Sequence, residues 1–218
     1  MLRINNSLLV KYEDRILNFV VGRLPRFVTP DILTFLGFLC SFFSFVFYLL
    51  AKSFRFLLIV NSLLIIFHWF FDNLDGRLAR YRKIERDRYG LFVDHSLDAF
   101  SSFLFLFGLG FSGLVKSEIW FVVSGLVLVL MSETYLYAAS RGVFKLSFGK
   151  FSGTEARFLF SFVNLLIFWS LKIEIFSVKI LLSDSIGLVF CGLVLITCVI
   201  EFFSSAFELD LLDKNLKN

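Results

Sequence analysis

Residues 55–80 read RFLLIVNSLLIIFHWFFDNLDGRLAR, and this stretch decides the fold. Its first part, 56–71, contains no Asp, Glu, Lys or Arg. A helix needs roughly 20 predominantly apolar residues to cross a membrane, so the stretch predicts a membrane-spanning helix. Its end is strongly polar and carries Asp72 and Asp75. An ionised carboxylate costs about 2.5–3.5 kcal/mol at the centre of a spanning helix, so these aspartates are candidates for a functional site.

The rest of the chain has the same apolar character. Of its 218 residues, 58% are hydrophobic, 32 are phenylalanine and only 18% are charged. Soluble domains average roughly 25% charged residues. A soluble enzyme, a disordered protein and a nucleic-acid-binding domain are therefore excluded, and no nucleic-acid partner is expected. The composition predicts an all-α integral membrane protein of six transmembrane helices, at 32–51, 55–80, 89–115, 118–139, 156–177 and 184–208.

The N-terminal segment has a different pattern. Residues 7–27 place apolar and charged side chains at helical spacing, which predicts an amphipathic helix in the membrane interface. We therefore expect one domain over residues 1–218, without internal repeats. It consists of the interfacial helix (1–28), a six-helix bundle (29–209) and a polar tail (210–218).

Basic residues are distributed unevenly between the two sides of the predicted bundle. Seventeen of the 22 Lys and Arg residues lie before the first span, between the second and third, between the fourth and fifth, or after the sixth. Loops on the cytoplasmic side of membrane proteins are enriched in Lys and Arg. We therefore expect a multi-pass protein whose termini and polar, aspartate-bearing face are in the cytoplasm.

Four aspartates occupy the second and third predicted spans. Asp72 and Asp75 are three residues apart, and Asp94 and Asp98 are four apart. Each pair therefore shares one helix face. If the two helices are neighbours, the four carboxylates converge, and their mutual repulsion requires a cation. A site made only of oxygen ligands selects Mg²⁺ or Mn²⁺ over softer metals.

The residues around the first aspartate pair indicate a ligand. Gly76 and Ala79 follow on the face of Asp72 and Asp75, and they are small enough for another group to approach the helix backbone. Arg80 lies on the same face and can hold a phosphate through two parallel hydrogen bonds. Acidic metal ligands, a notch of small residues and an arginine together predict a site for a metal-bound pyrophosphate.

Two aspartate pairs and four other residues form one motif, Asp72-x-x-Asp75-Gly76-x-x-Ala79-Arg80, then nine residues, then Gly90-x-x-x-Asp94-x-x-x-Asp98. This motif resembles the signature of the CDP-alcohol phosphotransferase family, and all eight fixed positions agree. Six spans and an interfacial N-terminal helix are also similar to that family. Residues 28–37 (VTPDILTFLG) resemble a common entry sequence of the family, with Asp31 where asparagine is usual.

The resemblance implies a transferase that moves a substituted phosphate from a CDP-linked donor to an alcohol hydroxyl and releases CMP. By motif position, two Mg²⁺ or Mn²⁺ ions would be held by Asp72, Asp75, Asp94 and Asp98. Asp98 would act as the general base beside Asp94. The cytidine diphosphate moiety would contact Asp72, Gly76, Ala79, Arg80 and Gly90. Dimers are common in the family, so a homodimer is consistent with the resemblance.

Two branches of the family remain open. One transfers phosphatidyl from CDP-diacylglycerol to a small polar alcohol, and the other transfers from CDP-choline or CDP-ethanolamine to diacylglycerol. Phe92-Val93-Asp94-His95 and Thr154-Glu155 resemble the second branch. Residues 147–157 (SFGKFSGTEAR) and the short chain resemble prokaryotic members of the first branch. We favour the first, and either branch requires a lipid substrate in the membrane.

The candidates for contact with the acceptor are Glu133, Arg141, Lys150, Glu155 and Arg157. Glu133 is a carboxylate within an apolar span, where it binds acceptor hydroxyls or pairs with a basic residue. Glu155 is a candidate through the Thr154-Glu155 resemblance. The basic residues would bind an acceptor that bears a phosphate. The alternative for them is the general excess of positive charge in cytoplasmic loops.

A cation transporter is a different class of protein that also needs carboxylates within its spans. Here the aspartates cluster at one end of two helices rather than along a path across the bilayer, which disfavours transport. A non-catalytic scaffold is disfavoured because all eight motif positions are intact. Release of CMP from a CDP-alcohol in the presence of Mg²⁺ or Mn²⁺ distinguishes these classes.

Overall fold

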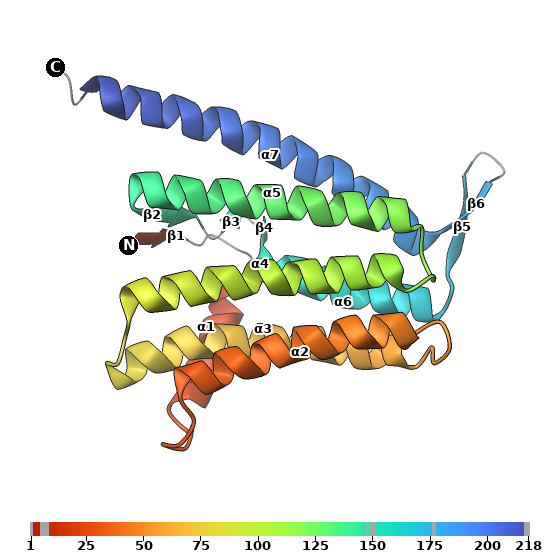
Figure 1. The fold of residues 1–218 in the computed structure, drawn as a ribbon, viewed down its shortest axis with the longest axis horizontal. Helices are drawn as coiled ribbons and strands as arrows, with labels where there is room; N and C mark the ends of the chain where they lie inside the picture. Colours follow the sequence, from red (N-terminus) through yellow and green to blue (C-terminus); the bar gives the residue numbers. More distant parts are fainter. Residues whose placement is uncertain (1, 5–8, 146, 149–150, 176–177, 216–218) are drawn as a thin grey trace.

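The computed structural model describes residues 2–4, 9–145, 147–148, 151–175 and 178–215. Its long helices run side by side as an elongated bundle (Figure 1). The helices of the described chain are α1 (Val10–Val21), α2 (Pro30–Leu50), α3 (Leu57–Arg82), α4 (Asp87–Phe111), α5 (Ser117–Arg141), α6 (Gly153–Phe168) and α7 (Leu182–Asn215). Both termini lie at the end of the bundle where α3 turns into α4 (Figure 1).

Short strands lie at the two ends of the bundle. β1 (Leu2–Ile4) pairs in parallel with β2 (Val143–Lys145). The other pairs are antiparallel: β3 (Ser147–Phe148) with β4 (Phe151–Ser152), and β5 (Lys172–Ile175) with β6 (Val178–Leu181). The β5–β6 hairpin projects from the end opposite the termini (Figure 1).

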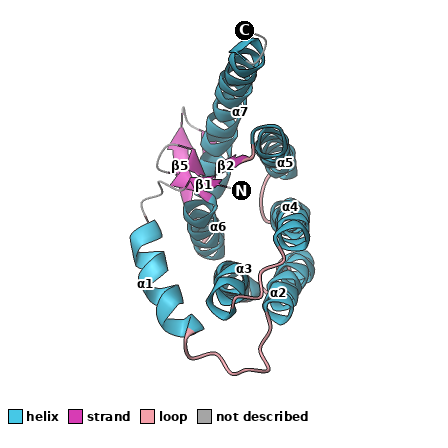
Figure 2. Ribbon diagram, turned by 90° about the vertical axis from the view of Figure 1, so that its left-hand side faces the viewer, coloured by secondary structure: helices cyan, strands magenta, loops and turns pink. Residues whose placement is uncertain are grey.

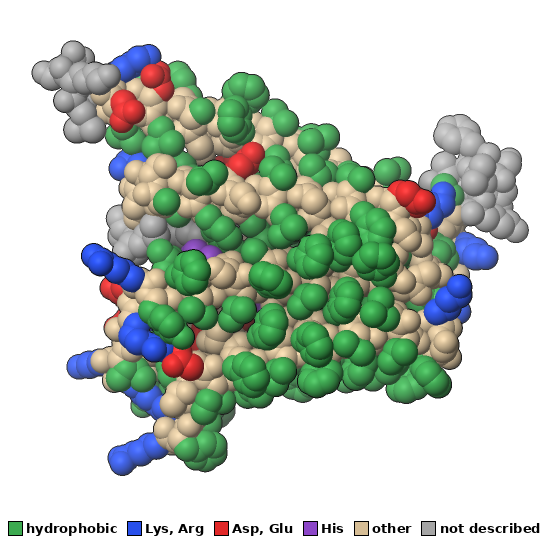
Figure 3. Space-filling view, viewed as in Figure 1, with side chains coloured by type: hydrophobic (Ala, Val, Ile, Leu, Met, Phe, Trp, Pro, Cys, Tyr) green, Lys and Arg blue, Asp and Glu red, His purple; other side chains and the backbone are tan. Residues whose placement is uncertain are grey.

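Within the described residues, α2, α3, α4, α5 and α7 are long and apolar enough to cross a membrane. Apolar side chains cover the flank of the bundle, and Lys and Arg gather at its ends (Figure 3). This distribution fits a multi-pass membrane protein. The number of six spans and the placement of α1 in the interface remain predictions.

Two predicted helix boundaries were wrong. The segment 156–177 was expected to be one span, but α6 has 16 residues, ends at Phe168, and is followed by β5. Such a helix is about 24 Å long, shorter than the hydrocarbon core of about 30 Å. Ser170, two residues after the end of α6, has a φ of 51°. In contrast, α7 continues through most of the predicted polar tail to Asn215.

The helices surround a common interior. Helix α2 packs against α3 and α4, α4 against α5, α5 against α7, and α3 against α6 (Figure 2). Gly108 allows α4 to approach α2 closely, because a Cβ there would lie 3.2 Å from the Cα of Phe45.

Helix α1 lies beside α3 at the edge of the bundle (Figure 2). Leu17 and Val21 are buried in a small core with Leu74 and Leu78 of α3. An ion pair of 2.6 Å also joins Asp14 of α1 to Arg77 of α3.

Candidate active site

A cavity of about 1510 Å³ extends through the interior of the bundle. Its polar wall is formed at the end near the termini, by the second half of α3, the first half of α4 and the loop between them. Towards the other end, the lining is apolar and includes Ile65, Phe105, Trp120, Phe160 and Phe190. One space therefore joins a charged region to an apolar one.

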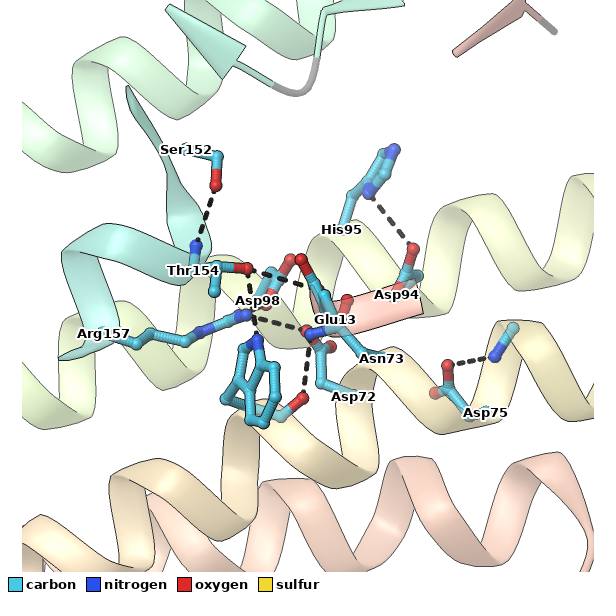
Figure 4. Close-up of polar contacts among 12 residues, drawn as sticks. Glu13, Asp72, Asn73, Asp75, Asp94, His95, Asp98, Ser152, Thr154 and Arg157 are labelled. Carbon is cyan, nitrogen blue, oxygen red and sulfur yellow. Dashed lines mark hydrogen bonds and ion pairs between the residues drawn. The ribbon is translucent and has the colours of Figure 1, made fainter. Parts of the chain in front are cut away.

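The charged region contains a cluster of aspartates. Asp72 of α3 and Asp94 and Asp98 of α4 each offer a carboxylate oxygen, and these oxygens lie within 4.8 Å of one another (Figure 4). We call these three residues the aspartate triad. All three are partly buried. The structure therefore brings together residues from the two spans that the sequence analysis expected to be neighbours.

The fourth predicted metal ligand, Asp75, lies apart from the triad (Figure 4). Its carboxylate accepts a hydrogen bond of 2.5 Å from Thr34 Oγ1 of α2, and another of 2.5 Å from the backbone N–H of Gly76. Asp75 still lines the cavity.

Arg157 of α6 contacts the triad directly. Its Nη1 donates to Asp72 Oδ2 at 2.9 Å, and its Nη2 donates to Asp98 Oδ1 (Figure 4). All three side chains are mostly shielded, with exposed fractions of 19% for Arg157, 20% for Asp72 and 25% for Asp98. Arg157 was predicted to contact the acceptor. In the structure it pairs with Asp72 and Asp98, two of the predicted metal ligands.

The start of α6 positions this arginine. Ser152 Oγ accepts from the backbone N–H of Thr154 at 3.2 Å, and Glu155 Oε2 accepts from the backbone N–H of Ser152 at 2.9 Å. This reciprocal arrangement is a capping box, which stabilises the first turn of a helix. Glu155 Oε1 also accepts from the backbone N–H of Leu9 at 3.1 Å. Glu155 therefore fixes the chain around the site.

The donor set of the triad fits a hard divalent cation. Three carboxylates gather around one guanidinium, so the cluster keeps an excess of negative charge. Each ligand atom is an oxygen, as Mg²⁺ and Mn²⁺ prefer. Asp72, Asp94 and Asp98 are the residues that would hold such an ion.

The residues expected to contact cytidine diphosphate all line the cavity: Asp72, Gly76, Ala79, Arg80 and Gly90. Space remains at Gly90, because a Cβ there would meet no atom within 4 Å. At Gly76, a Cβ would lie 3.5 Å from Arg80 Nη1, so the guanidinium lies over the small residue.

The remaining acceptor candidates are dispersed. Arg157 lines the cavity, whereas Glu133 and Arg141 are not among the described residues that do so. Arg141 instead pairs with Glu208 of α7, with 3.2 Å between Nε and Oε1. Lys150 lies outside the described residues.

The polar cavity residues for which the sequence predicted no role include Glu13 and Thr34. Glu13 had a usable signal, because it shares the buried face of α1 with Leu17 and Val21 at intervals of four residues. A carboxylate within an apolar stripe is unusual enough to mark. Thr34 belongs to residues 28–37, which resemble the family's entry sequence, but nothing in that segment indicates a contact with Asp75.

The fold and the site together define a multi-pass membrane protein with an aspartate-lined cavity. A sequence model for CDP-alcohol phosphatidyltransferase matches residues 27–201. The chain belongs to this family, which confirms the resemblance inferred from the motif. An archaetidylinositol phosphate synthase of Pyrococcus horikoshii is 33% identical over 96 residues. That match covers 44% of this chain and 47% of the relative, so the chain matches about half the length of this curated relative.

Proposed function

We propose that the chain is a metal-dependent transferase of phospholipid synthesis. It moves a phosphatidyl group from CDP-diacylglycerol to an alcohol hydroxyl and releases CMP. The observation that carries the proposal is the position of the aspartate triad in a cavity whose further wall is apolar. A diphosphate and a lipid chain can therefore occupy one continuous space.

The donor would be held from both sides of the polar region. The open space at Gly90 and the small side chains of Gly76 and Ala79 leave room for the nucleotide. Arg80 supplies a guanidinium that can bind a phosphate through two hydrogen bonds. The apolar lining can receive the acyl chains, which then stay in an apolar environment as they do in the bilayer.

Asp72 and Asp94 would hold divalent metal, with Asp98 completing the set and Asp75 assisting from the next turn. A divalent metal held by these residues would supply the positive charge that neutralises the diphosphate and the departing CMP. Asp98 accepts the proton of the acceptor hydroxyl. The hydroxyl oxygen forms a bond to the phosphorus of the transferred group, and the bond from that phosphorus to the CMP oxygen breaks.

The choice of branch rests on the relative. Its name specifies the synthesis of archaetidylinositol phosphate, in which a phosphorylated polyol is the headgroup. This supports transfer of a lipid-bearing phosphate to a polar alcohol. The alternative is transfer from CDP-choline or CDP-ethanolamine to diacylglycerol, and the experiment described below tests it alongside the first. Both termini share the end of the bundle that carries the site, which we place in the cytoplasm on the basis of the Lys and Arg distribution.

The proposal is tested by incubating the purified protein with CDP-diacylglycerol or CDP-choline, in Mn²⁺ and in EDTA. Each donor is supplied with inositol phosphate, glycerol phosphate, serine or diacylglycerol. We expect Mn²⁺-dependent CMP release from CDP-diacylglycerol together with a new phospholipid. The Asp72→Asn variant should lose this activity, whereas Glu208→Gln, which alters a carboxylate outside the cavity, should retain it. The proposal would be contradicted if neither CDP-diacylglycerol nor CDP-choline released CMP.

A further inference from the structure

Glu13 is a buried carboxylate supplied to the cavity by α1. Only 5% of the surface of Glu13 is exposed, and Glu13 lines the cavity. It lies outside residues 27–201, the part of the chain that matches the family. The neighbouring residues on its face of α1, Leu17 and Val21, are apolar and fill a core, so Glu13 is the charged exception on that face.

The two carboxylate oxygens of Glu13 have different surroundings. Oε1 accepts a hydrogen bond of 3.3 Å from Thr154 Oγ1, which in turn accepts one of 3.1 Å from Trp69 Nε1. Oε2 is enclosed and has no hydrogen-bond partner among the described residues. A buried polar atom without a partner costs about 1–3 kcal/mol, and more when it is charged. Docking α1 on Thr154 needs only one acceptor oxygen, so this contact does not explain the second.

Glu13 belongs to the same group of side chains as the proposed reaction site. Figure 4 shows it beside Thr154 and close to Asp72 and Asp98. A hydroxyl that enters between these groups can donate a hydrogen bond to Glu13. The guanidinium of Arg157 is bound to Asp72 and Asp98 in the same region.

The position of Glu13 is well fixed. Asp14, the next residue, pairs with Arg77 of α3 at 2.6 Å. The backbone N–H of Leu9 donates to Glu155 Oε1 at the start of α6. Leu17, one turn further along α1, is fully buried. A carboxylate held in this way is pre-organised to bind a ligand, which reduces the entropy cost of binding.

We propose that Glu13 is a substrate-binding residue that accepts a hydrogen bond from a second hydroxyl of the acceptor, while Asp98 takes the proton of the first. The inference rests on the proposed function and names its acceptor class as a polyol. Diacylglycerol has a single hydroxyl and cannot satisfy both carboxylates. Serine likewise has a single hydroxyl.

The test compares kinetic constants of the wild type, Glu13→Ala and Glu13→Gln with CDP-diacylglycerol as donor. The acceptors are inositol phosphate, glycerol phosphate and 3-hydroxypropyl phosphate, which lacks the second hydroxyl of glycerol phosphate. Glu13→Ala should raise the KM for the polyols by about 10- to 150-fold, as expected for one hydrogen bond to a charged group. The KM for the donor should stay the same, and the preference for glycerol phosphate over its deoxy analogue should disappear.

Glu208→Gln is the matched control, because it changes a carboxylate of α7 that pairs with Arg141 and lies outside the described cavity lining. It should leave the KM for each acceptor unchanged. Glu13→Gln keeps the shape and the contact with Thr154, so it supplies the comparison should the alanine variant fail to fold. An unchanged polyol preference in Glu13→Gln, or faster turnover with serine or diacylglycerol than with polyols in the wild type, would overturn the inference. If the wild type releases no CMP at all, the proposed function itself fails.

Discussion

Replacement of Arg157 by glutamine should destabilise the metal-free protein more than the metal-loaded protein. In the structure, the arginine is the cationic partner of two triad members, Asp72 and Asp98. The substitution removes the charge and leaves these carboxylates together without their cation. A divalent ion at the triad would restore positive charge in the variant, whereas in the wild type it has to compete with the guanidinium.

The size of the effect follows from burial. Breaking a buried ion pair costs about 3–5 kcal/mol, and an exposed pair contributes at most about 1 kcal/mol. The three side chains keep 19–25% of their surface exposed, so solvent screens part of the interaction. We expect a loss of about 2 kcal/mol in EDTA, which for a chain of this size corresponds to about 4–8 °C in Tm.

The assay is thermal denaturation of the purified protein in EDTA and in saturating Mn²⁺. The matched control is Arg141→Gln, which breaks the ion pair with Glu208 outside the cavity, where the side chains are 40% and 41% exposed. The control should shift Tm by less than about 4 °C, because exposed pairs contribute little. Its shift should be the same in EDTA and Mn²⁺. Mn²⁺ should raise the Tm of Arg157→Gln by more than it raises the Tm of the wild type. An Arg157→Gln variant that melts like the wild type in EDTA, or loses the same amount in both conditions, would refute the reasoning.

Four further predictions follow from individual contacts. Asp98→Asn should lower kcat by about 10²–10⁴-fold, as for loss of a general base, with unchanged helical circular dichroism; near-normal turnover would remove the base assignment. Arg80→Ala should raise the KM for the CDP donor by about 10- to 150-fold, and an unchanged donor KM would count against the phosphate contact. Gly110→Ala should lower the free energy of unfolding by about 1–3 kcal/mol in a denaturant titration, because its Cβ would lie 2.4 Å from the ring of Phe121; a neutral effect would show that the ring moves freely. Burial raises the pKa of Glu13 above its ordinary 4.5, so folding favours the protonated form. Stability should therefore be lost as the pH rises from about 4.5 through the folded-state pKa. Glu13→Gln should flatten this dependence of Tm in melting experiments from about pH 4 to 8, and a slope identical to that of the wild type would contradict the prediction.

The sequence was sufficient for the family, for the five helices long enough to cross a membrane and for the aspartate triad, because each depends on short-range patterns. Helical spacing puts Asp94 and Asp98 on one face, and one short loop between two long apolar helices brings them to Asp72. Spacing did not indicate that the carboxylate of Asp75 would lie apart from the triad, where it accepts a hydrogen bond from Thr34 of another helix. Spacing along a helix indicates a shared face, but partners on other helices decide where each oxygen points.

Tertiary contacts also explain what the sequence missed on α1 and α6. The burial of Glu13 depends on α1 packing against α3 and on Thr154, a residue far along the chain. Hydropathy predicted that this segment would continue as a span to 177, because the only charged residues from 169 to 177 are Lys172 and Glu174. The positive φ at Ser170 and the β5–β6 pairing end the helix instead. These are features of backbone geometry rather than of average composition.

The central claim is that the aspartate triad holds a divalent metal for phosphatidyl transfer. Anomalous diffraction from crystals soaked in Mn²⁺ tests it most directly. We predict an anomalous peak within coordination distance of Asp72, Asp94 and Asp98 in the wild type, and loss of this peak in Asp72→Asn. No peak at the triad, or a peak that persists unchanged in the variant, would contradict the account.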